Sequence, residues 1–116
     1  MTKKVVTHGW MEWINGGSHS RHPVVVSGKT CWGIGPGGAM QWIFGIPDDI
    51  PTGEPKDVRM YYAVNPNMPQ AWDMKEKREL TEKARETIGC QGDYTFDAVD
   101  DDFGWVDATI HLFCDE

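Results

Sequence analysis

The sequence is short of cysteine and of basic residues, and each shortage excludes a class of protein. Three cysteines (Cys31, Cys90 and Cys114) are an odd number and too few for a disulfide scaffold, so we expect reduced thiols. A Cys90–Cys114 bridge stays open, because it would tie a loop to the last predicted strand. Eleven Lys and Arg against eighteen Asp and Glu give a net charge of −7, which argues against nucleic acid or an anionic membrane as a partner.

Long apolar runs are also missing. No run approaches the roughly 18 apolar residues that a membrane helix requires, and the N-terminus lacks the apolar stretch of a signal peptide. We therefore expect a protein that is made and used without export. A chain of 116 residues predicts one domain, residues 1–116, with a single modest core. Six tryptophans are many for this length, and their rings can serve the core or a subunit contact.

The clearest pattern present is alternation in two segments, Met40–Ile46 and Val58–Val64. In the first, Met40, Trp42, Phe44 and Ile46 share one face, and the second alternates in the same way. Such alternation of aromatic and β-branched residues indicates strands that each give one face to a core. The connection Pro47–Asp57 contains three prolines, so it is predicted to be a loop.

Further strands are predicted along the chain, with one helix between them. The strands are Val5–Ile14, Val24–Val26, Tyr94–Ala98 and Val106–Cys114, and the segments predicted as loops are Asn15–Pro23, Cys31–Gly38 (with a brief strand at its start) and Asp100–Gly104. In Val5–Ile14, alternation places Val6, His8 and Trp10 together, and Met11 with Trp13 on the other face.

Asp73–Ile88 is the helical candidate, with Gly89 as its stop signal and a thin apolar stripe typical of a surface helix. The alternative, a strand over Trp72–Leu80, stays open. The fold class predicted is mainly β, a jelly-roll-like antiparallel β-sandwich with one surface helix or helical insert around residues 73–88.

No motif in the sequence declares a chemistry. Gly33–Gly38 matches the dinucleotide pattern G-x-G-x-x-G, but a strand pattern rather than a helix follows it. His19 and His22 lie in a predicted Gly/Ser-rich loop, and Asp97 with Asp100–Asp102 lacks the spacing of a calcium loop. We therefore predict no catalytic, cofactor-binding or metal-binding residues.

One resemblance carries a functional expectation. The aromatic strand Met40–Ile46, its Pro-Asp-Asp-Ile-Pro loop, the strand Val58–Val64 and the late strand Gly104–Phe113 resemble parts of small structural proteins of tailed phages. The resemblance implies a non-enzymatic virion protein, made in the host cytoplasm, that stabilises the head as a capsid decoration (cement) subunit. Its implied partner is the major capsid protein, and its implied state is a homotrimer.

In that hypothesis Trp10, Trp13 and Trp32 are the expected interface anchors, because their sequence surroundings are the least regular. Two alternatives remain. The first is a carbohydrate-binding β-sandwich of a tail fibre or enzyme, which would use exposed tryptophans. The second is a small enzyme with Cys31 and His22 as candidate reactive groups.

Overall fold

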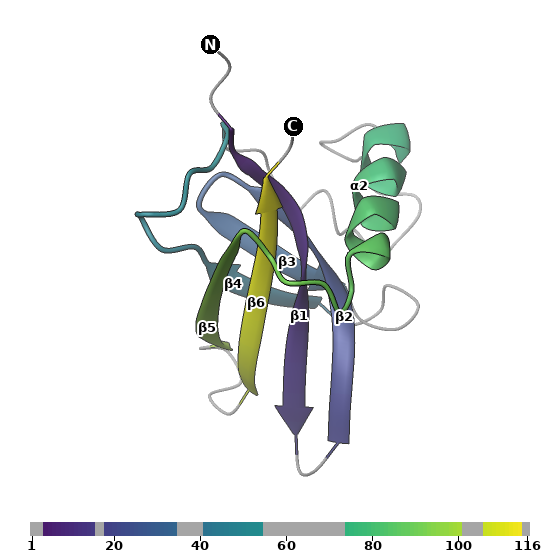
Figure 1. The fold of residues 1–116 in the computed structure, drawn as a ribbon, viewed down its shortest axis with the longest axis vertical. Coiled ribbons are helices and arrows are strands. Elements are labelled where there is room, and N and C mark those ends of the chain that lie inside the picture. The colour runs from purple at the N-terminus through teal and green to yellow at the C-terminus, as the bar shows by residue number, and fades with distance from the viewer. Residues whose placement is uncertain (1–3, 16–17, 35–40, 55–73, 101–105, 115–116) are drawn as a thin grey trace.

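The part of the chain that the structure describes forms one antiparallel sheet with one helix beside it (Figure 1). The computed structural model describes all residues except 1–3, 16–17, 35–40, 55–73, 101–105 and 115–116. The described elements are β1 (Val6–Asn15), β2 (Ser18–Ser27), β3 (Thr30–Ile34), β4 (Gln41–Gly45), α2 (Met74–Glu86), β5 (Tyr94–Asp100) and β6 (Val106–Cys114). The mainly β class predicted from the sequence is confirmed.

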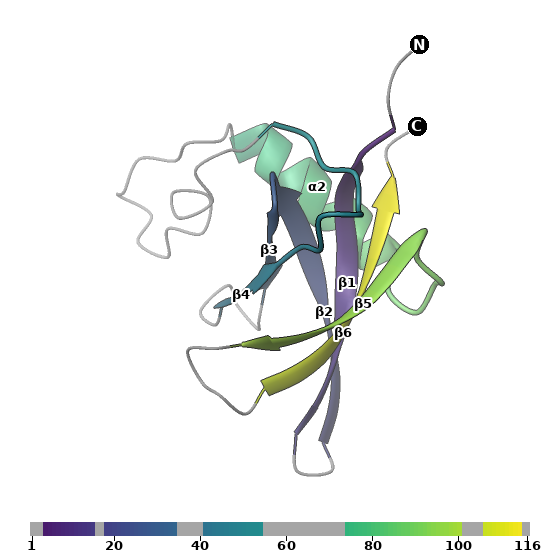
Figure 2. The same ribbon diagram turned by 90° about the vertical axis from the view of Figure 1, so that its left-hand side faces the viewer.

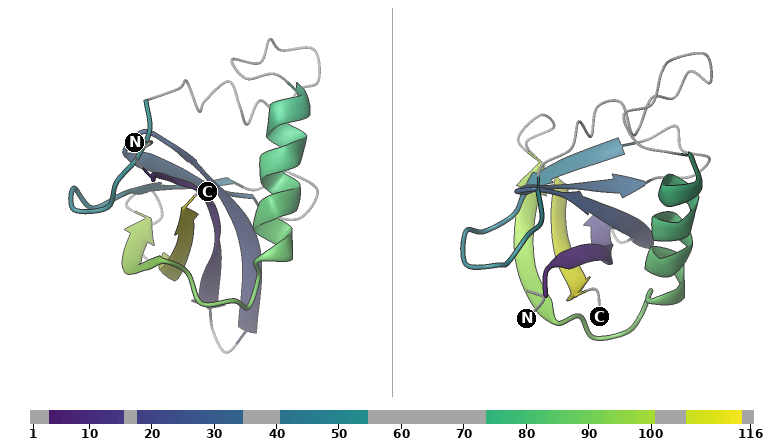
Figure 3. Two further views of the ribbon diagram at one scale, coloured as in Figure 1. Left: turned by 45° about the horizontal axis from the view of Figure 1, so that its top comes forward. Right: turned by 90° about the horizontal axis from the view of Figure 1, so that it is seen from above.

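The six strands follow the order β4-β3-β2-β1-β6-β5, and every neighbouring pair is antiparallel. The sheet curls into a half-barrel, so that β4 and β5, its two outer strands, approach each other (Figures 2 and 3). Curling of this kind is the natural consequence of strand twist over several strands. The described strands thus form one curled sheet.

The inner face of the sheet carries the core. Its buried members come from five elements and the loop after β4, and they are Val6, Met11, Val24, Val26, Cys31, Phe44, Ile46, Ile50, Ala108, Ile110 and Leu112. Tyr94, Phe96 and Ala98 of β5 pack against this cluster from its edge. The predicted inward alternation of β5 and β6 is confirmed, and Phe44 of β4 is buried as expected. The side chain of Trp42 and the predicted strand Val58–Val64 lie outside the described residues.

The alternation predicted for the first strand is broken at one point. A register shift between Val6 and His8 marks a β-bulge against β6, and it places Val6 in the core cluster while His8 stacks on Phe113. Beyond the bulge, Met11 lies in the core as predicted. A bulge adds one residue to one strand, so the side chains before it change face.

The loop predicted over Asn15–Pro23 is wrong. Ser18–Pro23 forms the first half of β2 and pairs with β1 from Asn15 to Trp10. Pro23 lies inside this strand opposite Trp10, although proline has no backbone N–H to give to a ladder. The polar composition concealed the strand, because its stabilising contacts are cross-strand pairs, such as the ion pair between His19 and Glu12, rather than apolar burial.

The brief strand predicted at the start of Cys31–Gly38 is confirmed, and it begins one residue earlier, at Thr30. Thr30–Ile34 is strand β3, which pairs with both β2 and β4, and residues 35–38 lie outside the described part. Gly28 has φ of 59°, a left-handed value that glycine adopts at low cost, in the two-residue turn that joins β2 to β3. Gly33 pairs with Val24 inside the sheet, so it cannot open a dinucleotide-binding loop.

Helix α2 confirms the helical prediction and excludes the alternative strand where the two overlap. It packs against β1 and β2 with Ala84 fully buried and its charged side chains from Glu79 onward exposed, as expected of a surface helix. It ends in a tight turn in which Thr87 N–H donates to Lys83 O and the Thr87 hydroxyl donates to Ala84 O. Gly89 has φ of 92°, which matches its predicted role as the stop.

The proline-rich loop after β4 is held against the sheet by Lys29. The Lys29 ammonium donates to three backbone carbonyls of the loop, Pro47 O (3.5 Å), Asp48 O (3.2 Å) and Ile50 O (2.8 Å). The loop then reaches the start of β1, where Val6 N–H donates to Pro51 O at 3.0 Å. Three acceptors match the three donors of an ammonium group, so Lys29 fixes a loop that has no strand partner of its own beyond the bridge at Thr52.

We expect Lys29→Met to loosen this loop without disturbing the sheet. Methionine keeps the length of the aliphatic stem but donates no hydrogen bond, so the cost is about 1 kcal/mol or somewhat more of unfolding free energy. Urea denaturation measures that cost, and amide exchange at Ile50 should rise together with it, because Ile50 N–H donates to Pro47 O within the loop. Arg85→Met, at an exposed position of α2, is the control and should change neither quantity.

Candidate functional site

A row of stacked rings crosses β1 and β6 on the outer face of the sheet. His8 stacks on Phe113 with ring centroids 5.6 Å apart, and Trp10 stacks on His111 with centroids 4.1 Å apart. Both pairs are nearly parallel, with interplanar angles of 11°. They are cross-strand neighbours in the β1–β6 ladder, so the register itself brings the rings together. We call these four residues the outer-face aromatic row.

Trp10 connects the outer-face aromatic row to the helix. Its indole Nε1–H donates to Cys90 O at 2.9 Å, across eighty residues of sequence, in the turn that follows α2. The guanidinium of Arg21 lies over the same indole, 5.5 Å from the ring centroid, within the range of a cation–π contact. The Trp10 side chain is therefore fixed by three different groups: His111, Cys90 and Arg21.

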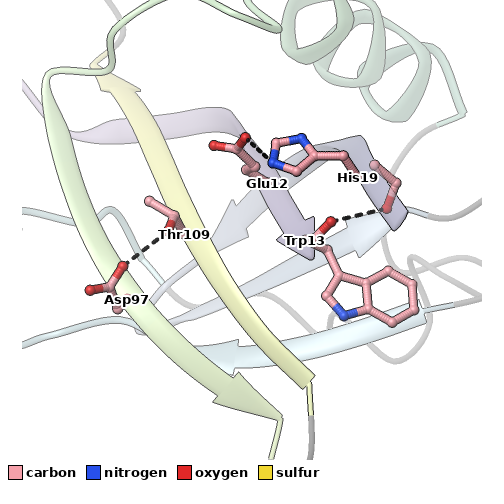
Figure 4. Close-up of polar contacts among 6 residues, drawn as sticks. Glu12, Trp13, His19, Asp97 and Thr109 are labelled. Atoms are coloured by element: carbon pink, nitrogen blue, oxygen red, sulfur yellow. Dashed lines mark hydrogen bonds and ion pairs between the residues drawn. The ribbon is translucent and has the colours of Figure 1, made fainter. Parts of the chain in front are cut away.

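A polar border runs beside the row. Glu12 Oε1 lies 3.0 Å from His19 Nε2, and Thr109 donates to Asp97 at 3.0 Å from β6 to β5 (Figure 4). Thr95 Oγ1 lies 3.4 Å from Nδ1 of His111, a long contact. Burial lowers the pKa of His111 from its usual 6.5 by disfavouring the charged ring, and the nearby Glu12 carboxylate opposes that shift.

The structure does not bring the three predicted tryptophan anchors together on an accessible surface. Trp10 is 4% exposed and Trp32 is 3% exposed. Both lie in regular strands, so the premise of irregular surroundings is wrong, and burial removes both side chains from the surface of this chain. Trp13 alone among the three is partly exposed, and its ring tilts against His22 at 6.4 Å.

Trp13 lies at the base of a projecting arm. The hairpin of β1 and β2 extends beyond the other strands in two perpendicular views (Figures 1 and 2). Pairing of β1 with β6 reaches no further than Trp13–Ala108, whereas pairing of β1 with β2 continues to Asn15–Ser18. We call residues 12–15 and 18–21 the hairpin arm. It carries Trp13 on its inner face and the Glu12–His19 ion pair on the other (Figure 4).

The sequence missed His111 as a site residue, although a signal was present. The alternation predicted for the last strand places Ile110 and Leu112 inward and so leaves His111 on the outer face, where His8 and Trp10 were predicted to share a face. What the sequence could not supply is the register between β1 and β6, which sets His111 opposite Trp10.

The thiols do not form the reactive group that the enzyme alternative requires. Cys31 is fully buried in the core, and desolvation raises the pKa of its thiol far above the usual range, so it stays protonated and inaccessible. All three cysteines are free, so the Cys90–Cys114 bridge is not formed. Cys114 is half-buried, and the pKa of its thiol is raised by burial and by Asp93.

The described residues contain neither a cluster of metal ligands nor a helix able to cross a membrane. No group of three or more His, Cys, Asp or Glu side chains in the described ranges is placed to hold a metal ion. Within the same part of the chain, no helix has the length and apolar character needed to cross a membrane.

Comparisons with known proteins add no functional assignment. No protein-family model matches the chain, and the searches of curated proteins and of solved structures find no significant match.

Proposed function

We propose that the protein is a non-enzymatic structural subunit of a tailed-phage virion that decorates the capsid and bridges neighbouring capsid subunits. The observation that carries the proposal is the hairpin arm, a two-stranded projection with a partly exposed tryptophan at its base. A projecting hairpin on a rigid curled sheet suits adhesion, because the sheet fixes the arm before contact and little ordering entropy is lost on binding.

Because Trp10 and Trp32 are buried, Trp13 is the one of the three predicted anchors that can take part in the adhesive surface. Aromatic anchors contribute most at the centre of an interface, where flanking contacts exclude water from them. Trp13 has such flanking groups beside it: His22, whose ring lies 6.4 Å from its own, and Ser20, whose hydroxyl donates to Trp13 O at 3.5 Å. The carbohydrate-binding alternative is less well supported, since two of the rings it would need are buried.

The proposal includes the major capsid protein as partner, the virion as location and a homotrimer as the assembled state. Six tryptophans and an acidic surface with a net charge of −7 are compatible with a subunit that is soluble alone and adhesive on the shell. The jelly-roll-like sandwich also belongs to the proposal. It would require a second sheet in addition to the described one, and the sequence predicts Met40–Ile46 and Val58–Val64 to be strands of that same sandwich.

We expect Trp13→Ala to weaken attachment to capsids by roughly 30-fold, which corresponds to about 2 kcal/mol for a central aromatic anchor. The target is capsids assembled from the major capsid protein of the proposed phage, and co-sedimentation measures binding after circular dichroism has shown that each variant folds. Ile43→Ala is the matched control, because Ile43 is a large exposed hydrophobic residue on β4, away from the hairpin arm.

Two results would contradict the proposal. The first is that Trp13→Ala and Ile43→Ala both bind capsids as tightly as the wild type. Trp13 would then contribute nothing to attachment, and the proposed adhesive surface would be wrong. The second is a monomer by light scattering at tens of micromolar together with no binding of the wild-type chain to capsids. Neighbouring genes for a portal, a protease and a major capsid protein are the expected genomic context.

A further inference from the structure

His111 is held in a position that suits only its neutral form. Its ring lies flat against Trp10 at 4.1 Å, and its Nδ1 faces Thr95 Oγ1. The other nitrogen, Nε2, is buried and has no hydrogen-bond partner among the described residues. A neutral histidine tolerates this arrangement. Its Nδ1–H can donate to Thr95 Oγ1, and Nε2, which carries no proton, is then an acceptor that lacks a donor.

Protonation changes that balance. The imidazolium carries an N–H on both nitrogens, so the buried Nε2 becomes a donor without an acceptor and the charge is only partly solvated. An unsatisfied buried donor destabilises the folded state, and more strongly when the group is charged. The ring can recover this cost by turning Nε2 towards water, and that movement takes it out of the stack with Trp10.

The charged groups around the His111 ring do not offset the cost of protonating it. On β1, Glu12 favours the cation, but Glu12 Oε1 already lies against His19 of β2. His8, the other histidine of the row, stacks on Phe113, and its Nδ1 lies 3.0 Å from Thr7 Oγ1. Arg21 of β2 lies over Trp10 and adds positive charge on the same face, while Asp97 of β5 accepts from Thr109. On α2, the described charged residues are all exposed; they are Glu79, Glu82, Lys83, Arg85 and Glu86.

The stack matters beyond the sheet because Trp10 is the hydrogen-bonded link to the turn after α2. Trp10 Nε1–H donates to Cys90 O, and that turn is otherwise closed by its own backbone bond from Cys90 N–H to Thr87 O. We propose that His111 makes the contact between the sheet and the turn after α2 pH-sensitive: the neutral ring holds Trp10 against Cys90, and the protonated ring releases it.

The sign of the effect follows from the direction of the pKa shift. The folded pKa of His111 lies below 6.5, so the unfolded chain binds the proton more readily than the folded one. The stability that the neutral ring contributes is complete above about pH 6.5 and is lost as pH falls from there to the folded pKa. Release of the turn therefore accompanies mild acidification. This inference does not depend on the proposed function.

The test follows the six tryptophan indole N–H signals of the full chain by ¹⁵N–¹H NMR between pH 8 and pH 5. The Trp10 signal is assigned by its absence in Trp10→Phe. We expect the Trp10 indole and the Cys90 amide to titrate together with the His111 ring, at a midpoint below 6.5. The protection of the indole proton against exchange, corrected for the intrinsic pH dependence, should fall several-fold through the same midpoint.

Three variants make the result specific. His111→Phe keeps a flat ring against Trp10 but removes the titration, so both signals should stay constant. Glu12→Gln removes the charge that favours the cation and should move the midpoint lower. His19→Asn frees the Glu12 carboxylate from its partner, so the midpoint at Trp10 should rise or stay at the wild-type value, opposite in sign to the effect of Glu12→Gln.

Constant Trp10 and Cys90 signals in the wild type overturn the inference, and so does the same titration in His111→Phe. A Trp10 shift without any loss of indole protection also overturns it, because the contact would then sense the charge without opening.

Discussion

Gly9→Ala is expected to prevent folding or to lower the free energy of unfolding by about 3 kcal/mol or more, the upper end of the cost of overpacking a core. Gly9 lies in β1 between Val24 of β2 and Leu112 of β6. A Cβ atom there would overlap the backbone oxygen of His111 and would lie 2.9 Å from Leu112 Cδ2. Backbone cannot move aside as a flexible side chain can, so the β1–β6 ladder must open to admit the methyl group.

Gly45→Ala is the matched control, because it makes the same substitution at another strand position. Nothing lies within 4 Å of a Cβ atom built at Gly45, and we expect a change of no more than about 0.5 kcal/mol in either direction. Urea denaturation of both variants measures the difference. Equal midpoints would mean that β1 and β6 do not approach as closely at Gly9 as the structure has them.

The sequence predicted strands well where one face is apolar. Met40–Ile46 and Val106–Cys114 alternate clearly, and the structure has strands at Gln41–Gly45 and Val106–Cys114. Burial of alternate side chains imposes a period of two on the sequence, so the evidence for such a strand is local. The helix was predictable for a similar reason, since Gly89 marks its stop and Ala84 its buried side.

The first half of β2 was not predictable in this way. His19 and Arg21 lie on the outer face, where Glu12 pairs with His19. Pro23, a residue that usually argues against a strand, pairs with Trp10 here. What makes this segment a strand is the neighbouring β1, through cross-strand contacts that no local pattern records.

The site was predicted least well, because exposure is a property of the assembled chain. Trp10 was expected at the surface, yet the turn carrying Cys90 covers it from eighty residues further along the chain. The importance of His111 likewise follows from its register with Trp10. Neither relation can be read from spacing in one segment.

Phe44→Ala is expected to cost about 3–5 kcal/mol of unfolding free energy, the range for removing a buried aromatic ring from a core. Phe44 is 2% exposed within the inner cluster, whereas its neighbour Ile43 is 43% exposed on the same strand. Ile43→Ala therefore loses little burial and should cost less than about 1 kcal/mol. The two residues are adjacent in β4, so any general effect of a substitution on that strand is shared. The difference between the two variants therefore measures the contribution of the buried face of β4. Urea midpoints with unchanged slopes give the two values.

A larger loss for Ile43→Ala than for Phe44→Ala would mean that β4 presents its other face to the core. That arrangement is a register shift by one residue, and it would expose every inward side chain of the strand.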